Sequence, residues 1–195
     1  MNILMNKLFL ILSFIVVVIT SSAQKPIKCL IKTSLGNITV EVYPGKAPAT
    51  VANFLRYVDA HRYDSSSFFR AVRMDNQPNN NVKIEVIQGG NVDSLEQFPP
   101  IPMETTGQTG LHHLDGTISM ARGAPDSATS SFFICINDQP SLDFGGNRNP
   151  DGQGFAAFGK VIDGMDVVKK IQNLYPDQQQ YFKPAVTIIS ITRVQ

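Results

Sequence analysis

Cysteine is scarce in this sequence, and neither sign of charge is in excess. Of the 195 residues only two are cysteines, Cys29 and Cys135, so a scaffold built on several disulfides is excluded. Both lie in apolar runs, which favours two buried free thiols and leaves a single disulfide between them open. The 17 basic and 16 acidic residues nearly cancel and form no Lys/Arg cluster, which excludes the basic surface of a nucleic-acid-binding protein.

Ligand spacing for a metal ion is also missing. His112 and His113 are adjacent on an expected loop, without a cysteine or carboxylate at ligand spacing. Residues 147–154 form a turn-rich loop that lacks the spaced acidic ligands and final glutamate of a calcium loop. The Asp-Phe-Gly triplet at 143–145 occurs in kinases, but no glycine-rich loop accompanies it. We therefore expect no metal and no cofactor.

An apolar span of transmembrane length is absent, although the chain begins with a shorter apolar run. Lys7 precedes an apolar run at 8–19 and small residues at 21–23, a pattern typical of a cleaved signal peptide that covers 1–23. The run is shorter than the roughly 20 residues that span a bilayer, so we expect no stable membrane association after cleavage. An uncleaved anchor is the alternative. The mature chain, 24–195, is expected to be periplasmic or secreted, with an endoplasmic reticulum lumen as a further destination.

Repeats, linkers and low-complexity tracts are absent from this mature chain, so we expect one domain. Short runs of alternating apolar residues predict strands. In one of them, Ile38, Val40 and Val42 share a face. The predicted strands cover 28–33, 37–43, 67–72, 83–88, 117–121, 131–136, 155–161 and 185–194.

Two stretches have the period of a helix instead. Apolar residues at i, i+3, i+4 and i+7 predict a helix at 48–60, with Pro48 near its N-terminus, where a proline is tolerated. A second helix is predicted at 165–172, with Asp163 as its N-cap and two lysines near its end. Eight short strands with only two helices argue against βαβ units and favour an antiparallel sandwich or barrel.

Six short motifs occur in a fixed order along the chain. They are KAPATVANF at 46–54, FFRAV at 68–72, QGG at 88–90, GTISMAR at 116–122, SSFFI at 130–134 and FGKV at 158–161. The ordered set resembles the cyclophilin family of peptidyl-prolyl cis-trans isomerases. The resemblance implies a closed eight-stranded antiparallel β-barrel capped by two α-helices, with a substrate groove on its outer surface. It also implies an enzyme, expected as a monomer, that binds proline-containing polypeptides and assists the folding of exported proteins.

The resemblance further implies the site residues, one position at a time. Arg70, which follows two phenylalanines, matches the catalytic arginine of the family. Gln88 matches the glutamine that holds the substrate backbone, Phe133 the floor of the proline pocket and Leu142 its wall. The implied substrate-binding residues are Val86, Gln88, Ala121, Arg122, Phe133, Leu142 and Phe155.

The chain departs from the family pattern near this expected pocket. Residues 74–81 form a polar insertion between the catalytic arginine and Gln88, which leaves the local register open. Glu85 then stands where the family has an aromatic residue, unless Ile84 faces the pocket instead. Ser131 replaces a second family glutamine. These departures motivate an alternative function, a proline-peptide-binding module or holdase chaperone with weak or no turnover.

An arginine suits the implied reaction because rotation about an X-Pro bond needs no nucleophile or metal. The barrier of about 18 to 20 kcal/mol exists because the nitrogen lone pair is delocalised into the carbonyl. A guanidinium is permanently charged and presents its N–H groups in a fixed fork, so one of them can point at the prolyl nitrogen as it becomes pyramidal. Such a catalyst binds the twisted bond more tightly than the planar one.

Overall fold

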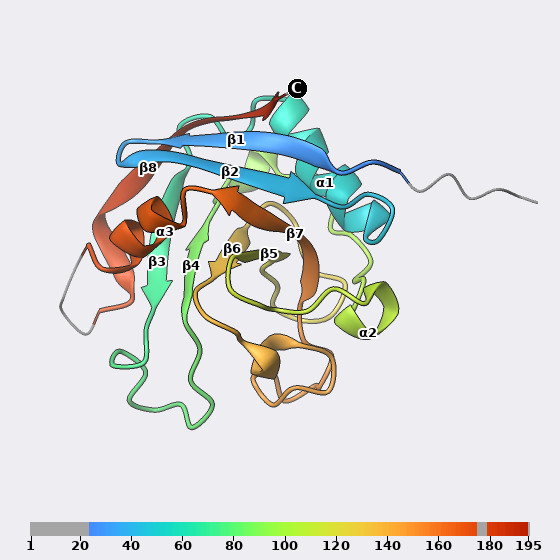
Figure 1. The fold of residues 1–195 in the computed structure, drawn as a ribbon, viewed down its shortest axis with the longest axis vertical. Helices are drawn as coiled ribbons and strands as arrows, with labels where there is room; N and C mark the ends of the chain where they lie inside the picture. The colour runs from blue at the N-terminus through green and yellow to red at the C-terminus, as the bar shows by residue number, and fades with distance from the viewer. Residues whose placement is uncertain (1–23, 175–178, 195) are drawn as a thin grey trace, which may run out of the picture.

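Eight antiparallel strands close into a barrel in the computed structural model, which describes residues 24–174 and 179–194. Each strand pairs with two neighbours in the order β1-β2-β7-β5-β6-β4-β3-β8 (Figure 1). Closure removes the sheet edges that would otherwise pair with other chains. The predicted antiparallel barrel is confirmed. The predicted signal peptide at 1–23 lies outside the described residues.

All strands of the barrel except the last are short. They are β1 (Ile27–Thr33), β2 (Gly36–Val42), β3 (Ser67–Val72), β4 (Val86–Gly89), β5 (Thr117–Met120), β6 (Phe132–Cys135), β7 (Ala156–Asp163) and β8 (Tyr181–Val194). Each overlaps a predicted strand. However, β4 begins later than predicted and β8 begins earlier.

Three α-helices accompany the barrel in the described residues: α1 (Pro48–Asp59), α2 (Thr106–Thr109) and α3 (Met165–Gln172). The helices α1 and α3 confirm the two predicted ones, and α1 starts with its proline in the first turn. The helix α2 is a turn of only 4 residues and has no counterpart in the sequence predictions. Within the described ranges, no helix has the length and apolar character needed to cross a membrane.

The prediction that Asp163 caps α3 is wrong. Asp163 ends β7, where it pairs with Thr39, and the N-cap is Gly164 with a φ of 92°. A Cβ atom on Gly164 would lie 2.4 Å from the carbonyl oxygen of Asn37. The sharp turn from β7 into α3 therefore requires a glycine, both for its positive φ and for its lack of a side chain.

Apolar side chains fill the barrel interior. Phe54 on α1 and Ile171 on α3 are both fully buried there, so each long helix covers part of the core. The ring centroid of Phe54 lies 5.8 Å from that of Phe132, edge to face, and 5.2 Å from that of Phe158. Such packing leaves no room for a substrate inside, so a binding site has to lie on the outer surface.

A smaller apolar group, the outer cluster, lies outside the barrel over β3, β4 and β6. It contains Cys135, whereas Cys29 belongs to the interior. Both cysteines are buried and free, which confirms the predicted thiols, and burial raises the pKa of Cys29 to about 11. The members of the outer cluster are Val72, Ile84, Val86, Phe133, Cys135 and Leu142.

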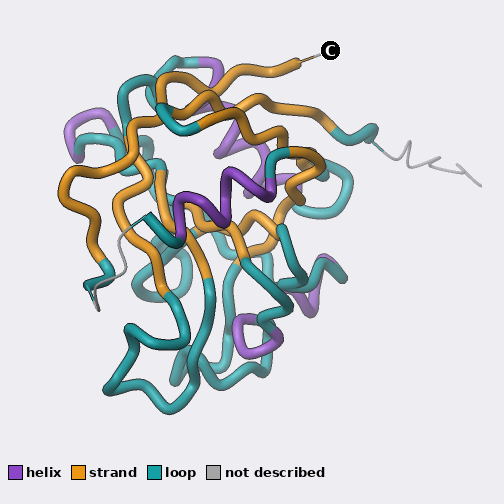
Figure 2. Tube along the Cα trace, turned by 60° about the vertical axis from the view of Figure 1, so that its left-hand side comes forward, coloured by secondary structure: helices purple, strands orange, loops and turns teal. Residues whose placement is uncertain are grey.

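Two long loops extend from the barrel at one end, seen at the bottom of Figures 1 and 2. One joins β3 to β4, and the other joins β6 to β7. Arg148 in the second loop donates hydrogen bonds to Gln77 Oε1 (3.0 Å) and to the carbonyl of Val82 (2.6 Å) in the first. These hydrogen bonds join the two loops into a wall beside the outer cluster.

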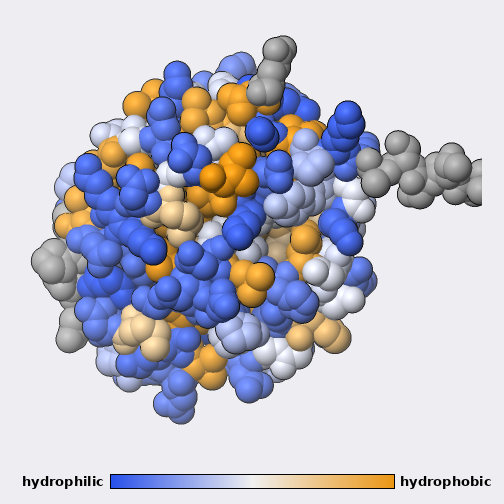
Figure 3. All heavy atoms as spheres, in the orientation of Figure 1, coloured by the Kyte–Doolittle hydropathy of each residue, from blue (hydrophilic) through white to orange (hydrophobic). Residues whose placement is uncertain are grey.

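The face drawn in Figure 3 is largely hydrophilic, with apolar residues in small separate groups.

Candidate active site

A bulge in β3 turns Arg70 to the outside of the barrel. The pairing of β3 with both β4 and β8 shifts register between Phe68 and Arg70. Phe68 is buried in the interior, and regular alternation would place Arg70 on the same side, because residues i and i+2 of a strand share a face. The register shift instead exposes Arg70 to a cavity on the outer surface. Bulges commonly re-aim side chains in this way next to active sites.

Strand register aligns three of the predicted site residues. Arg70 on β3 pairs with Gln88 on β4, and Gln88 pairs with Phe133 on β6. Their sequence neighbours Ala71 and Ile87 belong to the interior core. The three residues therefore form a row across adjacent strands of the barrel wall.

All eight predicted site residues line one cavity of about 230 Å³, the Phe133 cavity. The structure brings together every residue that the resemblance implied, while the role of each stays a prediction. Arg148 and Asn149, from the loop between β6 and β7, also line it and were marked by no motif. The complete lining is Arg70, Ile84, Val86, Gln88, Ala121, Arg122, Phe133, Leu142, Arg148, Asn149 and Phe155.

Aromatic rings form much of the apolar surface of the Phe133 cavity. Phe133 is 4% exposed and meets Phe155 edge to face, with ring centroids 5.3 Å apart. It also stacks on His113 at 5.8 Å, with an angle of 14° between the ring planes. Leu142 and Val86, both buried, complete the outer cluster around it. An apolar ring placed here would gain about 25 cal/mol for each Å² removed from water.

Ile84 rather than Glu85 faces the cavity, which resolves the alternative that the insertion left open. Ile84 is 7% exposed and belongs to the lining. Glu85 does not, and its carboxylate accepts a hydrogen bond of 2.8 Å from Asn137 Nδ2. The side chain of Gln77 fixes this register, since it accepts from the N–H of Ile84 (3.2 Å) and donates to its carbonyl (2.8 Å). The carboxylate of Glu85 is thus kept out of the Phe133 cavity.

Two glutamines hold the guanidinium of Arg70. Its Nη1 donates to Gln88 Oε1 (3.2 Å), while Nε (3.0 Å) and Nη2 (2.6 Å) both donate to Gln180 Oε1. Gln180 Nε2 donates in turn to the carbonyl of Asn76 (2.8 Å), in the insertion. Since an arginine has five N–H donors, two remain for a substrate. Gln180 could not be identified from the sequence, because no motif marks it and it lies 110 residues from Arg70 along the chain.

Arg122 shapes the cavity but carries a neutralised charge. Its Nη1 and Nη2 donate to the two carboxylate oxygens of Asp151 at 2.7 and 2.9 Å, and its Nε donates to the carbonyl of Gly154 at 2.8 Å. These hydrogen bonds lower the pKa of Asp151 to about 2. The guanidinium lies 5.3 Å from the ring centre of Phe155, so Arg122 packs against one wall of the cavity.

A buried polar chain supports the Phe133 ring. Asp143 Oδ1 lies 2.6 Å from His113 Nδ1, and His113 Nε2 lies 2.9 Å from Ser119 Oγ. His113 is 1% exposed and Ser119 0%, so a substrate cannot reach this serine and the chain is structural rather than nucleophilic. Burial lowers the pKa of His113 although a carboxylate faces it. No group of three His, Cys, Asp or Glu residues within 24–174 and 179–194 could hold a metal ion.

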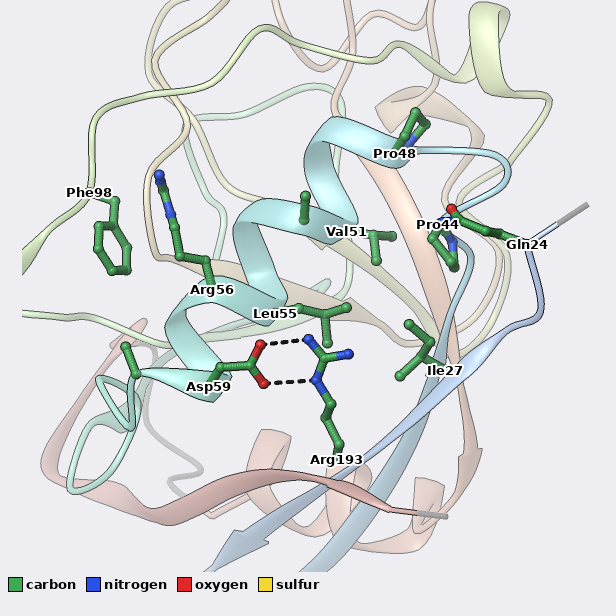
Figure 4. Close-up of a pocket in the computed structure, with 12 residues that line it drawn as sticks. Gln24, Ile27, Pro44, Pro48, Val51, Leu55, Arg56, Asp59, Phe98 and Arg193 are labelled. Carbon is green, nitrogen blue, oxygen red and sulfur yellow. Dashed lines mark hydrogen bonds and ion pairs between the residues drawn. The ribbon is translucent and has the colours of Figure 1, made fainter.

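A wider groove of about 750 Å³ lies along α1, and Figure 4 shows the side chains that line it. The charged side chains of this groove already interact with neighbouring side chains. Asp59 and Arg193 form a two-bonded ion pair at 2.6 and 2.8 Å, seen as dashed lines, and the guanidinium of Arg56 lies 4.0 Å from the ring centre of Phe98. The Phe133 cavity, by contrast, has a guanidinium with free N–H donors, that of Arg70, beside apolar side chains.

Known proteins are similar to this chain in sequence. The family described as cyclophilin type peptidyl-prolyl cis-trans isomerase/CLD matches residues 28–193. The chain belongs to this family. A peptidyl-prolyl cis-trans isomerase of Acinetobacter baylyi is 40% identical to this cyclophilin over 167 residues, which cover 82% of the chain and 81% of the relative. Peptidyl-prolyl cis-trans isomerase B of Escherichia coli is 36% identical over 145 residues, with 73% and 82% covered.

Solved cyclophilin structures have the same fold. A cyclophilin type peptidyl-prolyl cis-trans isomerase of Cryptosporidium parvum superposes with a TM-score of 0.70 at 20% identity, covering 88% of this chain and 99% of that one. Its structure in the presence of the dipeptide Ala-Pro gives a TM-score of 0.67, also at 20% identity, with 86% and 99% covered. The fold, the family and the enzyme class predicted from the sequence are confirmed: the chain is a peptidyl-prolyl cis-trans isomerase.

Proposed function

We propose that this cyclophilin isomerises X-Pro bonds at the Phe133 cavity and that Arg70 is its catalytic residue. The observation that carries the proposal is a guanidinium that lines a cavity of about 230 Å³ beside the apolar side chains of Phe133 and Leu142 and keeps N–H donors free. Phe133 and Leu142 bury the proline ring, and Gln88 binds the substrate backbone beside Arg70. Glu85, which motivated the alternative of a binding module, lies outside this cavity.

Arg70 accelerates rotation by binding the twisted bond. As the bond leaves the plane, the prolyl nitrogen regains its lone pair and becomes a hydrogen-bond acceptor, which the planar amide nitrogen is not. A donor fixed beside that nitrogen is therefore satisfied only in the transition state, and this difference in binding lowers the barrier. The reaction leaves the guanidinium charged and transfers no atom, so the enzyme is ready for the next substrate.

Replacing Arg70 with alanine tests this assignment. In a protease-coupled assay with a proline tetrapeptide, Arg70→Ala should lower kcat/KM by about 100-fold, the effect of removing one transition-state donor. Its melting temperature should stay close to that of the wild type, because the lost hydrogen bonds are only partly buried. Arg193→Ala is the matched control, since Arg193 is exposed and lines only the groove along α1. Unchanged turnover in Arg70→Ala would refute the assignment.

We also propose that the enzyme is exported and acts as a monomer on proline-containing polypeptides that fold outside the cytoplasm. A basic residue, an apolar run and small residues within 1–23 support a cleaved signal peptide. The periplasm is the favoured destination and secretion the alternative. X-Pro isomerisation takes tens to hundreds of seconds without a catalyst, so an exported chain with a non-native proline isomer would gain most from it.

A further inference from the structure

A second cavity adjoins the Phe133 cavity. It has a volume of about 290 Å³, and we call it the insertion cavity, because residues of the 74–81 insertion form one side of it. Two arginines, Arg70 and Arg148, line both cavities, so the two spaces share a wall. The insertion cavity is lined by Arg70, Gln77, Pro78, Asn79, Asn80, Arg148 and Gln180.

Buried amide side chains hold the insertion in place. Asn76 and Gln77 are 2% and 3% exposed, although the sequence suggested only a polar turn. Asn76 Oδ1 accepts from the N–H of Arg73 (2.8 Å), and its Nδ2 donates to the carbonyl of Ala71 (3.1 Å). Gln77 is bonded on both ends, to Ile84 and to Arg148. The wall of the insertion cavity is thus a built part of the fold.

The two shared arginines differ from other arginines nearby in lacking an acidic partner. Arg122 is paired with Asp151, and Arg73 with Asp75. Among the described residues no ion pair includes Arg70 or Arg148.

Arg148 in addition keeps donors without a partner. Its Nη1 is bonded to Gln77 and to the carbonyl of Val82, while Nε and Nη2 donate to no described residue. Both nitrogens are accessible. In the described ranges, the one side-chain nitrogen or oxygen that is both buried and unbonded is Gln172 Nε2. Two like charges beside one small polar cavity repel each other, and an anion between them would relieve this.

We propose that the insertion cavity is a subsite for an acidic side chain that flanks the substrate proline. The inference rests on the proposed function, in which the proline ring occupies the Phe133 cavity. A peptide bound there passes Arg70, and the residue next to the proline then lies beside the shared wall. An aspartate or glutamate at that residue would accept hydrogen bonds from the free donors of Arg148. The insertion thereby gives this cyclophilin a preference for acidic sequences around proline.

Two series of blocked peptides, acetylated and amidated so that no terminal charge remains, test the proposal. One series carries glutamate, glutamine or lysine immediately before the proline, and the other carries them immediately after it. Isomerisation is measured by NMR exchange spectroscopy, which needs no protease. One of the two series has its variable residue beside the insertion cavity. In that series we expect kcat/KM for the glutamate peptide to exceed that for the glutamine peptide by about five- to tenfold at low salt, with the lysine peptide below both. The preference should shrink in about 0.5 M salt.

The ratio of glutamate to glutamine turnover in Arg148→Gln is the decisive readout, because it cancels general effects on activity. The ratio should fall toward one in this variant and stay at the wild-type value in Lys160→Gln, which removes an exposed charge that lines neither cavity. Equal rates for all peptides in wild type would overturn the subsite and leave the isomerase assignment standing. A glutamate preference that survives in Arg148→Gln would also overturn it. Failure to accelerate any peptide would overturn the proposed active site, and the subsite with it.

Discussion

The aim of Arg70 depends on Gln180, and this dependence can be measured. Gln180→Ala removes the single acceptor that receives both Nε and Nη2 of the guanidinium, at 3.0 and 2.6 Å. A hydrogen bond to a charged group contributes about 1.5 to 3 kcal/mol, but Arg70 is half-buried and water replaces part of the loss. We therefore expect a net loss of about 1 to 2 kcal/mol in transition-state binding, which is about 5- to 30-fold in rate.

The loss should appear in kcat rather than in KM. The apolar walls that bind the proline ring are untouched in Gln180→Ala, so ground-state binding persists while the donor loses its aim. Gln180→Glu keeps an acceptor for Arg70 and should retain more activity than the alanine variant. Gln179→Ala is the matched control, because Gln179 is exposed and, among the described residues, only its backbone carbonyl is bonded, to Asn76 Nδ2 at 3.5 Å. A kcat equal to that of the wild type in Gln180→Ala would show that Arg70 does not need this glutamine.

Two further predictions concern stability and processing. Burial lowers the pKa of His113 below 6.5, so the folded protein resists a proton that the unfolded chain takes up. The neutral buried histidine therefore contributes stability above about pH 6.5. This contribution should be lost as the pH falls through the lower pKa of the folded state. The drop in melting temperature from pH 8 to pH 5 should accordingly be smaller in His113→Gln, and equal drops would contradict a buried neutral histidine. For processing, N-terminal sequencing of the exported protein should begin at Gln24, whereas an intact Met1 on membrane-bound protein would indicate an uncleaved anchor.

Local sequence patterns were sufficient for most of the barrel. The alternation in 37–43 predicts β2, and the spacing of apolar residues in 48–60 predicts α1, since each pattern states which side of a regular element meets the core. The closed topology itself came from the family resemblance, because alternation alone does not separate a barrel from a sandwich. The residues that the resemblance implies for the site line one cavity, including Arg122, which follows β5, and Phe155, which precedes β7.

Features that depend on contacts distant in sequence could not be predicted. The predicted strand at 83–88 begins only at Val86, because the side chain of Gln77 takes the backbone N–H and carbonyl of Ile84 that a neighbouring strand would otherwise use. Gln180 meets Arg70 only once β8 lies beside β3. No local propensity encodes either contact, since each requires a single side chain to satisfy a group brought to it by the fold.

The position of the site follows from how a small closed barrel is filled. Its interior is packed with fully buried side chains, so alternation along each strand leaves only outward positions for function. Each functional residue consequently follows or precedes a core residue: Arg70 is next to Ala71 and Gln88 is next to Ile87, both fully buried. The core fixes the backbone from which the guanidinium projects, and second contacts such as that of Gln180 fix its direction. A reaction that requires only a held ring and one aimed donor can therefore draw its precision from the same packing that stabilises the fold.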